Sequence, residues 1–143
     1  MKVKDVMTSE VYSINKGEDI SKAAQIMRNA YIGILPVEDG EKVVGMITDR
    51  DITTRNVAQG HTGEIPCEEA MTAEVISCSP ETPVEEAVDL MKKFQVRRLP
   101  VIENGDLIGM VALGDLATED ATDEEAGSAL SNISTPSKPK DIE

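Results

Sequence analysis

The sequence is poor in aromatic residues and in positive charge. Its 143 residues include no tryptophan, one phenylalanine and two tyrosines, so an aliphatic core is expected. The 27 acidic residues outnumber the 14 lysines and arginines, which gives a formal net charge of −13. A nucleic-acid-binding surface needs clustered positive charge and aromatic side chains on which bases stack. We therefore expect no nucleic-acid partner.

Cysteine, histidine and long apolar runs are also scarce. The two cysteines, Cys67 and Cys78, form no CxxC pair, and the single histidine, His61, lies in a glycine-bounded segment. This distribution predicts no disulfide scaffold, no metal site and no nucleophile–base pair, so we expect a protein that is not an enzyme. No apolar run reaches the roughly 18 residues that cross a bilayer, and the charged N-terminus does not resemble a signal peptide. We expect a cytoplasmic protein without a membrane partner.

The two halves of the chain repeat each other. Shifting the sequence by 64 residues superimposes four motifs without a gap. They are Met7-Thr8-x-Glu10 on Met71-Thr72-x-Glu74, Leu35-Pro36-Val37 on Leu99-Pro100-Val101, Gly45-Met46 on Gly109-Met110, and Asp51 on Asp115. A unit of this size cannot bury its apolar faces well alone. The two copies should therefore pack together as one body.

Each copy has the same predicted order of elements, β-α-β-β-α. A short strand (11–14, and 75–78 in the second copy) precedes a helix whose apolar residues recur every three or four positions. Two strands follow at 34–38 and 42–48, and at 98–102 and 106–112, before a last helix that begins near Asp49 or Leu113. The sequence thus predicts an α/β fold in which two repeats, 1–60 and 67–118, pack as a pseudo-two-fold pair joined by a linker at 61–66.

The C-terminal segment 119–143 belongs to neither repeat. It is acidic and contains serine and proline, a composition that is typical of chains without a packed core. We expect it to be a largely disordered tail.

The repeated pattern resembles a pair of CBS domains, also called a Bateman module. The resemblance rests on the two Leu-Pro-Val strands and on the run Gly45-Met46-Ile47-Thr48-Asp49-Arg50-Asp51 at a strand-to-helix junction, and it covers about residues 1–118. It extends to small stand-alone bacterial CBS proteins of the hypoxic-response type. The resemblance implies a sensor of adenosine nucleotides that forms a homodimer and acts on a separate regulated protein.

Thr48 and Asp51 are the candidate ribose ligands. A carboxylate can accept hydrogen bonds from both hydroxyls of a ribose diol, and a threonine adds a small hydroxyl beside it. Gly45 is expected to let the ligand approach the backbone. The Thr-x-x-Asp spacing is also that of a helix capping box, and the two roles are compatible.

The resemblance implies that this motif faces the strands of the second repeat. Val75, Ile76, Val96 and Pro100 would form an apolar slot for adenine, and Arg97 and Arg98 stand where the family places a basic phosphate pair. Neighbouring residues on a strand point to opposite faces, so the pattern leaves open which arginine contacts phosphate. The predicted site comprises Met46, Thr48, Arg50, Asp51, Val75, Ile76, Val96, Arg97, Arg98 and Pro100.

The second site is predicted to be weaker. Its motif keeps Asp115 but has Ala112 in place of the threonine, and the facing segment 32–36 contains no arginine. We therefore expect a degraded site, which is either empty or recognises base and ribose without a phosphate ligand. The predicted residues are Val11, Tyr12, Ile32, Gly33, Ile34, Pro36 and Asp115.

Two functions are consistent with these patterns. The first is a non-catalytic regulatory module that binds AMP, ADP or ATP, with or without Mg²⁺, between its repeats and changes the repeat or dimer pose. It requires no obligatory cofactor. The alternative is a ligand-independent dimeric scaffold that binds a partner protein. The presence of Thr48 and Asp51 favours the ligand-binding module. The loss of the threonine from the second motif, where Ala112 stands, favours the ligand-independent scaffold.

Overall fold

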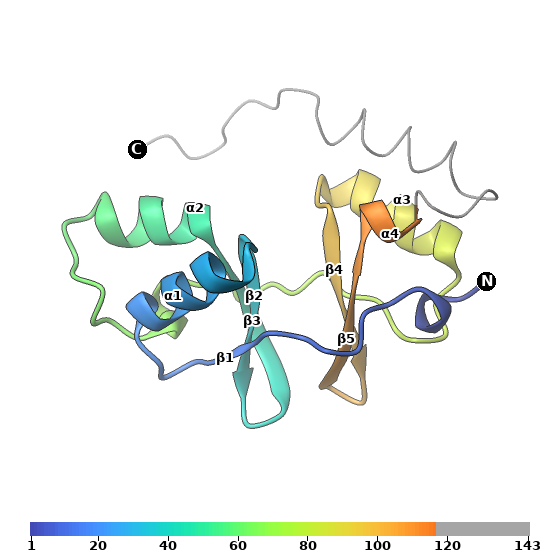
Figure 1. Cartoon of the computed structure of the whole chain (residues 1–143), viewed down its shortest axis with the longest axis horizontal. Helices are drawn as coiled ribbons and strands as arrows, with labels where there is room; N and C mark the ends of the chain where they lie inside the picture. Colours follow the sequence, from blue (N-terminus) through green and yellow to red (C-terminus); the bar gives the residue numbers. More distant parts are fainter. Residues whose placement is uncertain (117–143) are drawn as a thin grey trace.

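A computed structural model of the chain describes residues 1–116 (Figure 1). The predicted tail at 119–143 lies outside these residues. The described part forms two units side by side, each with a β-hairpin and helices. None of the helices in residues 1–116 is long and apolar enough to cross a membrane.

The observed elements confirm the predicted α/β class and the repeated order. The first unit contains β1 (Ile14–Asn15), α1 (Ile20–Ala30), β2 (Ile34–Asp39), β3 (Lys42–Thr48), α2 (Asp49–Ile52) and the π-helical turn η2 (Thr53–Val57). The second contains α3 (Val84–Phe94), β4 (Arg98–Glu103), β5 (Asp106–Ala112) and α4 (Leu113–Leu116). Short 3-10 turns, η1 (Val3–Asp5) and η3 (Cys67–Glu69), precede the two repeats of this pattern.

The first strand of each repeat is shorter than predicted. In the first repeat the strand begins at Ile14 rather than near residue 11, and in the second repeat the pairing shrinks to one parallel bridge between Cys78 and Val101. In β1 the ladder continues because the Lys16 N–H donates to the Glu38 carbonyl at 2.8 Å. The equivalent residue in the second repeat is Pro80, which has no N–H to donate.

One mixed sheet runs through both units in the order β1-β2-β3-β5-β4. Within each hairpin the strands pair along their length, whereas β3 and β5 pair only at Lys42 and Asp106, next to the hairpin turns. The Lys42 Nζ to Asp106 Oδ1 distance of 2.8 Å adds an ion pair at this point. The hairpins are therefore joined at their turn ends, away from the strand ends that carry the repeated site motifs.

The repeats exchange their first segments. Val3 is fully buried in the core of the second unit, and Thr8 forms a bridge with Met110 of β5. In the same way Cys67 is buried in the core of the first unit, and Thr72 forms a bridge with Met46 of β3. Figure 1 shows the N-terminal segment lying beside the second hairpin before the chain crosses to the first.

Gly45 makes this exchange possible. A Cβ at Gly45 would lie 2.5 Å from Met71 Sδ and 2.8 Å from the Thr72 carbonyl oxygen. At the equivalent Gly109 it would lie 2.7 Å from Met7 Sδ and 2.9 Å from the carbonyl oxygen of Thr8. The close approach expected at Gly45 is thus made by a segment of the other repeat rather than by a ligand.

Candidate functional site

Two clefts lie between the repeats, near the strand ends opposite the hairpin turns. The first has a volume of about 310 Å³ and the second about 180 Å³. The first is lined by Ile34, Met46, Thr48, Asp51, Thr72, Glu74, Ile76, Phe94, Val96, Arg98 and Pro100. The second is lined by Thr8, Glu10, Val11, Tyr12, Ile32, Ile34, Pro36, Arg98, Met110, Ala112 and Asp115. Most residues of one lining are the repeat equivalents of residues in the other.

The Thr48–Asp51 pair of the first cleft forms the capping box of α2. The Thr48 N–H donates to Asp51 Oδ2 at 3.0 Å, and the Asp51 N–H donates to Thr48 Oγ1 at 3.0 Å. The Asp51 side chain is 14% exposed, and its Oδ1 lies 3.8 Å from Nε of Arg55. The cap therefore uses one carboxylate oxygen and fixes the side chain at the cleft with the other oxygen available as an acceptor.

The structure brings most of the first predicted set together. Met46, Thr48 and Asp51 come from β3 and α2 of the first repeat, whereas Ile76, Val96, Arg98 and Pro100 come from the second. The first cleft thus combines a polar edge from the first repeat with a mainly apolar wall from the second, to which Glu74 and Arg98 add charge.

Three predicted residues, Arg50, Val75 and Arg97, do not line this cleft. Arg98 begins β4 and lines the cleft, whereas Arg97 precedes the strand and is not in the lining. Arg50 is exposed on α2, where its N–H donates to Asp49 Oδ1 at 2.8 Å. The sequence left open which of Arg97 and Arg98 faces the cleft, and the structure places Arg98 there.

Four lining residues of the first cleft, Ile34, Thr72, Glu74 and Phe94, were absent from the predicted set. For Thr72 and Glu74 a signal was available. They belong to the repeated Met-Thr-x-Glu motif, which the segment exchange carries to the opposite repeat's cleft. Phe94, at the end of α3, carried no such signal.

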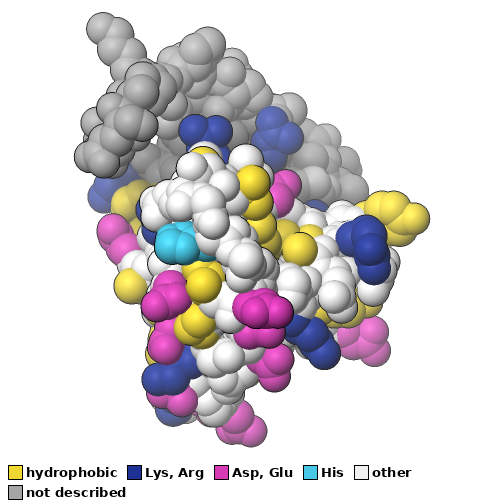
Figure 2. Space-filling view, turned by 90° about the vertical axis from the view of Figure 1, so that its left-hand side faces the viewer, with side chains coloured by type: hydrophobic (Ala, Val, Ile, Leu, Met, Phe, Trp, Pro, Cys, Tyr) yellow, Lys and Arg dark blue, Asp and Glu magenta, His cyan; other side chains and the backbone are white. Residues whose placement is uncertain are grey.

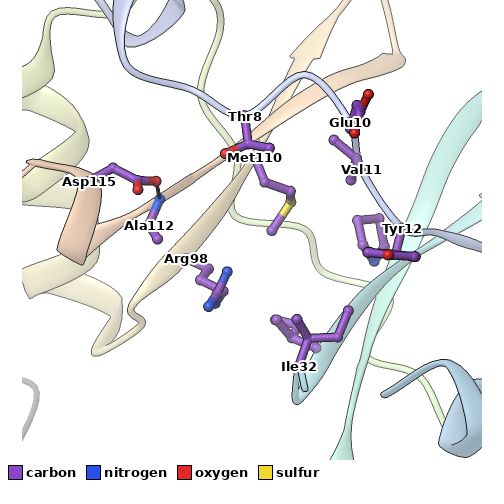
Figure 3. Close-up of a pocket in the computed structure, with 11 residues that line it drawn as sticks. Thr8, Glu10, Val11, Tyr12, Ile32, Arg98, Met110, Ala112 and Asp115 are labelled. Carbon is purple, nitrogen blue, oxygen red and sulfur yellow. Dashed lines mark hydrogen bonds between the residues drawn. The ribbon is translucent and has the colours of Figure 1, made fainter. Parts of the chain in front are cut away.

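The second cleft contains all but one of the residues predicted for it (Figure 3). Asp115 accepts a hydrogen bond from the Ala112 N–H at 3.0 Å, the same capping contact that Asp51 makes in the first cleft. Gly33 is the exception, because it lies against the side chain of Asp49, whose Oδ2 would be 3.0 Å from an added Cβ. The lining also contains residues that were not predicted, among them Thr8, Glu10, Met110 and Ala112.

Arg98 also lines the second cleft, which the sequence did not predict. The facing segment 32–36 contains no arginine, but Arg98 enters from the start of β4 in the other repeat. Figure 3 shows its side chain in the space between Asp115 and Ile32. Contrary to the expectation from segment 32–36, a guanidinium therefore stands in the lining of this cleft.

The remaining titratable groups do not assemble into a metal site within residues 1–116. No three histidine, cysteine, aspartate or glutamate side chains of this part of the chain lie together in a way that could hold a metal ion. Cys67 and Cys78 are free and buried in separate cores, and burial raises the pKa of each thiol to about 11. His61 is exposed on the face of the first unit, where acidic and basic side chains are mixed (Figure 2).

Comparison with known proteins places this geometry in a family. The family model of the CBS domain matches residues 3–57 and residues 67–121. The CBS domain-containing protein YhcV of Bacillus subtilis is 44% identical over 132 residues, which cover 92% of this chain and 94% of the relative.

Two solved structures are similar to this chain in fold. The crystal structure of Hypoxic Response Protein I, described with two coordinated zinc ions, has a TM-score of 0.75 and 32% identity and covers 82% of this chain and 98% of that one. The CBS domain pair of protein MJ0100, in complex with 5-methylthioadenosine and S-adenosyl-L-methionine, has a TM-score of 0.72 and 28% identity. That match covers 82% of this chain and 94% of the other.

Proposed function

Because the chain belongs to the CBS-domain family and carries two of these domains in tandem, we propose that it is a regulatory module that binds an adenosine-containing ligand between its repeats. The observation that carries the proposal is the composition of the first cleft. Asp51 of one repeat faces an apolar wall that includes Ile76 and Val96 of the other. A nucleoside needs these two environments, a diol acceptor and a slot for the base, on opposite sides of one cavity.

The ribose would bind at Asp51 and Thr48. Asp51 Oδ2 is already engaged in the cap, so the ribose hydroxyls would donate to Oδ1, the oxygen 3.8 Å from Arg55. The Thr48 hydroxyl lies beside it and can still donate, because in the cap it only accepts. The cap would thus hold the side chains of Thr48 and Asp51 in place before the nucleoside binds, which lowers the entropy cost of ordering them.

Adenine would lie against the apolar residues of the second repeat. Ile76, Val96 and Pro100 provide this surface, and Phe94 closes its edge with 38% of its area exposed. Burial of a planar base between aliphatic side chains is favourable in proportion to the apolar area removed from water. The charged residues that the second repeat adds to this lining are Glu74 and, at the start of β4, Arg98.

AMP is the adenine nucleotide that the first cleft would suit best. Arg98 is the cleft's single cation among residues 1–116, and a guanidinium can engage one phosphate with two parallel hydrogen bonds. Glu74, in the same lining, would repel the additional negative charge of ADP or ATP. The MJ0100 pair is described with two adenosyl compounds, which supports the wider ligand class.

Ligand binding would act on the pose of the two repeats. Asp51 and Arg98 belong to different repeats, so a ligand held by both would draw the two hairpins together at the ends where they are not paired. A ligand shifts such an equilibrium only by the difference between its affinities for the two poses. The output would be read by a separate regulated protein, and a homodimer would transmit the change between copies.

A thermal-shift panel of adenosine, AMP, ADP, ATP, 5-methylthioadenosine and S-adenosylmethionine tests the proposal. A ligand at 100 times its dissociation constant adds about 2.7 kcal/mol to the stability of the folded state, which corresponds to a shift of several degrees. We expect such a shift with AMP. The absence of any shift at millimolar concentration would overturn the proposal and favour the ligand-independent scaffold. Sedimentation with and without AMP would test the homodimer.

A further inference from the structure

Arg98 occupies a position that both clefts share. It lines the first cleft beside Pro100 and Val96, and it lines the second beside Asp115 and Met110. Its equivalent in the first repeat, Ile34, also lines both clefts. The first residues of β2 and β4 therefore lie where the two clefts meet, and the repeats differ there by one charge.

The charge balance of both clefts depends on this one side chain. Among residues 1–116, Arg98 is the only lysine or arginine in either lining. Each cleft also carries two carboxylates, Asp51 and Glu74 in the first, and Glu10 and Asp115 in the second. Without the guanidinium, each lining keeps two carboxylates and no cation among the described residues, with Arg55 Nε 3.8 Å from Asp51 Oδ1 behind the first, and would bind an anionic ligand less well.

We propose that the two clefts share Arg98 as their single phosphate ligand, so that the pair binds one phosphate-bearing adenosine compound tightly at a time. The inference rests on the proposed function. A guanidinium that forms a two-pronged contact with one phosphate cannot form the same contact with a second phosphate in another cleft. An adenosine compound without phosphate needs no such contact and can fill both clefts.

Two observations support the proposal that Arg98 can contact a phosphate in either cleft. Arg98 is exposed, and within the described residues its side chain forms no ion pair that would hold it to one cleft. In Figure 3 no dashed line joins the Arg98 side chain to another residue of the second cleft. Capture by the first cleft is favoured because that cleft is larger and has Thr48 where the second has Ala112.

The consequence is negative coupling between the clefts for anionic ligands only. Binding of AMP in the first cleft removes the cation from the second, and by linkage the reverse holds with the same factor. A charge-assisted hydrogen bond changes affinity by about tenfold to a hundredfold. The second AMP should therefore bind at least about tenfold more weakly than the first, while adenosine should bind both clefts independently.

Calorimetric titration of the full chain with adenosine and with AMP tests this. We expect two adenosine molecules per chain, but one tight AMP and one weak AMP. Ile34→Arg places a second guanidinium at the equivalent position, so this variant should bind two AMP molecules with affinities within about threefold of each other. Arg98→Gln should lower AMP affinity by about tenfold to a hundredfold, to the level of the adenosine affinity measured on the same variant.

Cooperative thermal unfolding reports whether each variant is folded, and Ile34→Lys provides a second way to add the charge. Two equal AMP sites on the wild-type chain would overturn the inference, as would a second AMP that stays weak in both Ile34 variants. Adenosine binding at one cleft alone would also overturn it, because the second cleft would then be closed to every ligand. In each of these cases the proposed function survives. Failure of every compound in the thermal-shift panel to bind would instead reject the proposed function, and the inference with it.

Discussion

Thr8 and Met110, one from each repeat, exchange two backbone hydrogen bonds of 2.8 and 2.9 Å. The equivalent pair, Thr72 and Met46, does the same at 2.8 and 2.9 Å. Each β-hairpin therefore receives an additional backbone segment from the other repeat. Because Val3 and Cys67 then enter the opposite cores, neither repeat buries its apolar surface without the other.

Gly45→Ala tests the exchange directly. The new methyl group would lie 2.8 Å from the Thr72 backbone oxygen, so the incoming segment must move. Overpacking of this kind costs about 1–3 kcal/mol. We expect a loss of that size in the free energy of unfolding, measured by urea denaturation.

Gly114→Ala is the matched control, because a Cβ at this position in α4 would meet nothing within 4 Å. It should leave stability unchanged or raise it by up to about 1 kcal/mol. Equal stability of the Gly45 variant and the control would show that the segment is not held against β3.

Gln95→Gly should stabilise the chain. Gln95 follows α3 with φ 53°, in the left-handed region where a side chain is strained and glycine is not. We expect a gain of about 0.5–1 kcal/mol in the free energy of unfolding. Gln95→Ala keeps the strain and should gain nothing, so an equal gain in both variants would point to a cause other than the backbone.

Stability should fall at alkaline pH because of the two buried thiols. Burial raises the pKa of both Cys67 and Cys78 from 9.0 to about 11 in the folded chain. Above pH 9 the unfolded chain loses its thiol protons first, so the stabilisation that is complete below pH 9 is lost as pH rises toward 11. At pH 10 the expected loss is about 1–1.5 kcal/mol for each thiol.

Unfolding free energies at pH 8 and pH 10 measure this loss. The double variant Cys67→Ala, Cys78→Ala isolates the contribution of the two thiols. Its stability should change less between the two pH values than that of the wild-type chain. An identical change would assign the alkaline loss to other groups.

The fold was largely predictable from the sequence because the hydrophobic pattern and the repeat agree. The strands 42–48 and 106–112 appear with the predicted bounds. The ends of the helices were harder to predict from the sequence. Tyr31 and Gln95 adopt the left-handed conformation there without the glycine or asparagine that usually marks it. The lengths of the first strands depend on individual backbone hydrogen bonds. Lys16 donates one that extends β1, whereas Pro80, at the equivalent position, has no N–H to donate.

The clefts were predictable only in part. Thr48 and Asp51 stand in a local motif, and the structure places both at the first cleft. Glu74 and Arg98 reach their positions through contacts between repeats, which a repeat pattern does not specify. In particular, the strand alternation indicates that only one of Arg97 and Arg98 faces a given side, but not that this side opens onto two clefts.

The most direct test of the account is a calorimetric titration of AMP into wild-type chain and Asp51→Asn. The amide oxygen of asparagine can still accept the hydrogen bond from the Thr48 N–H, so the cap is retained, but the second acceptor oxygen for ribose is lost. Asp115→Asn makes the same change at the second cleft and is the matched control. We predict that Asp51→Asn weakens the tight AMP site by about tenfold or more while Asp115→Asn leaves it intact. Wild-type AMP affinity in Asp51→Asn would contradict the assignment of the first cleft as the ligand site.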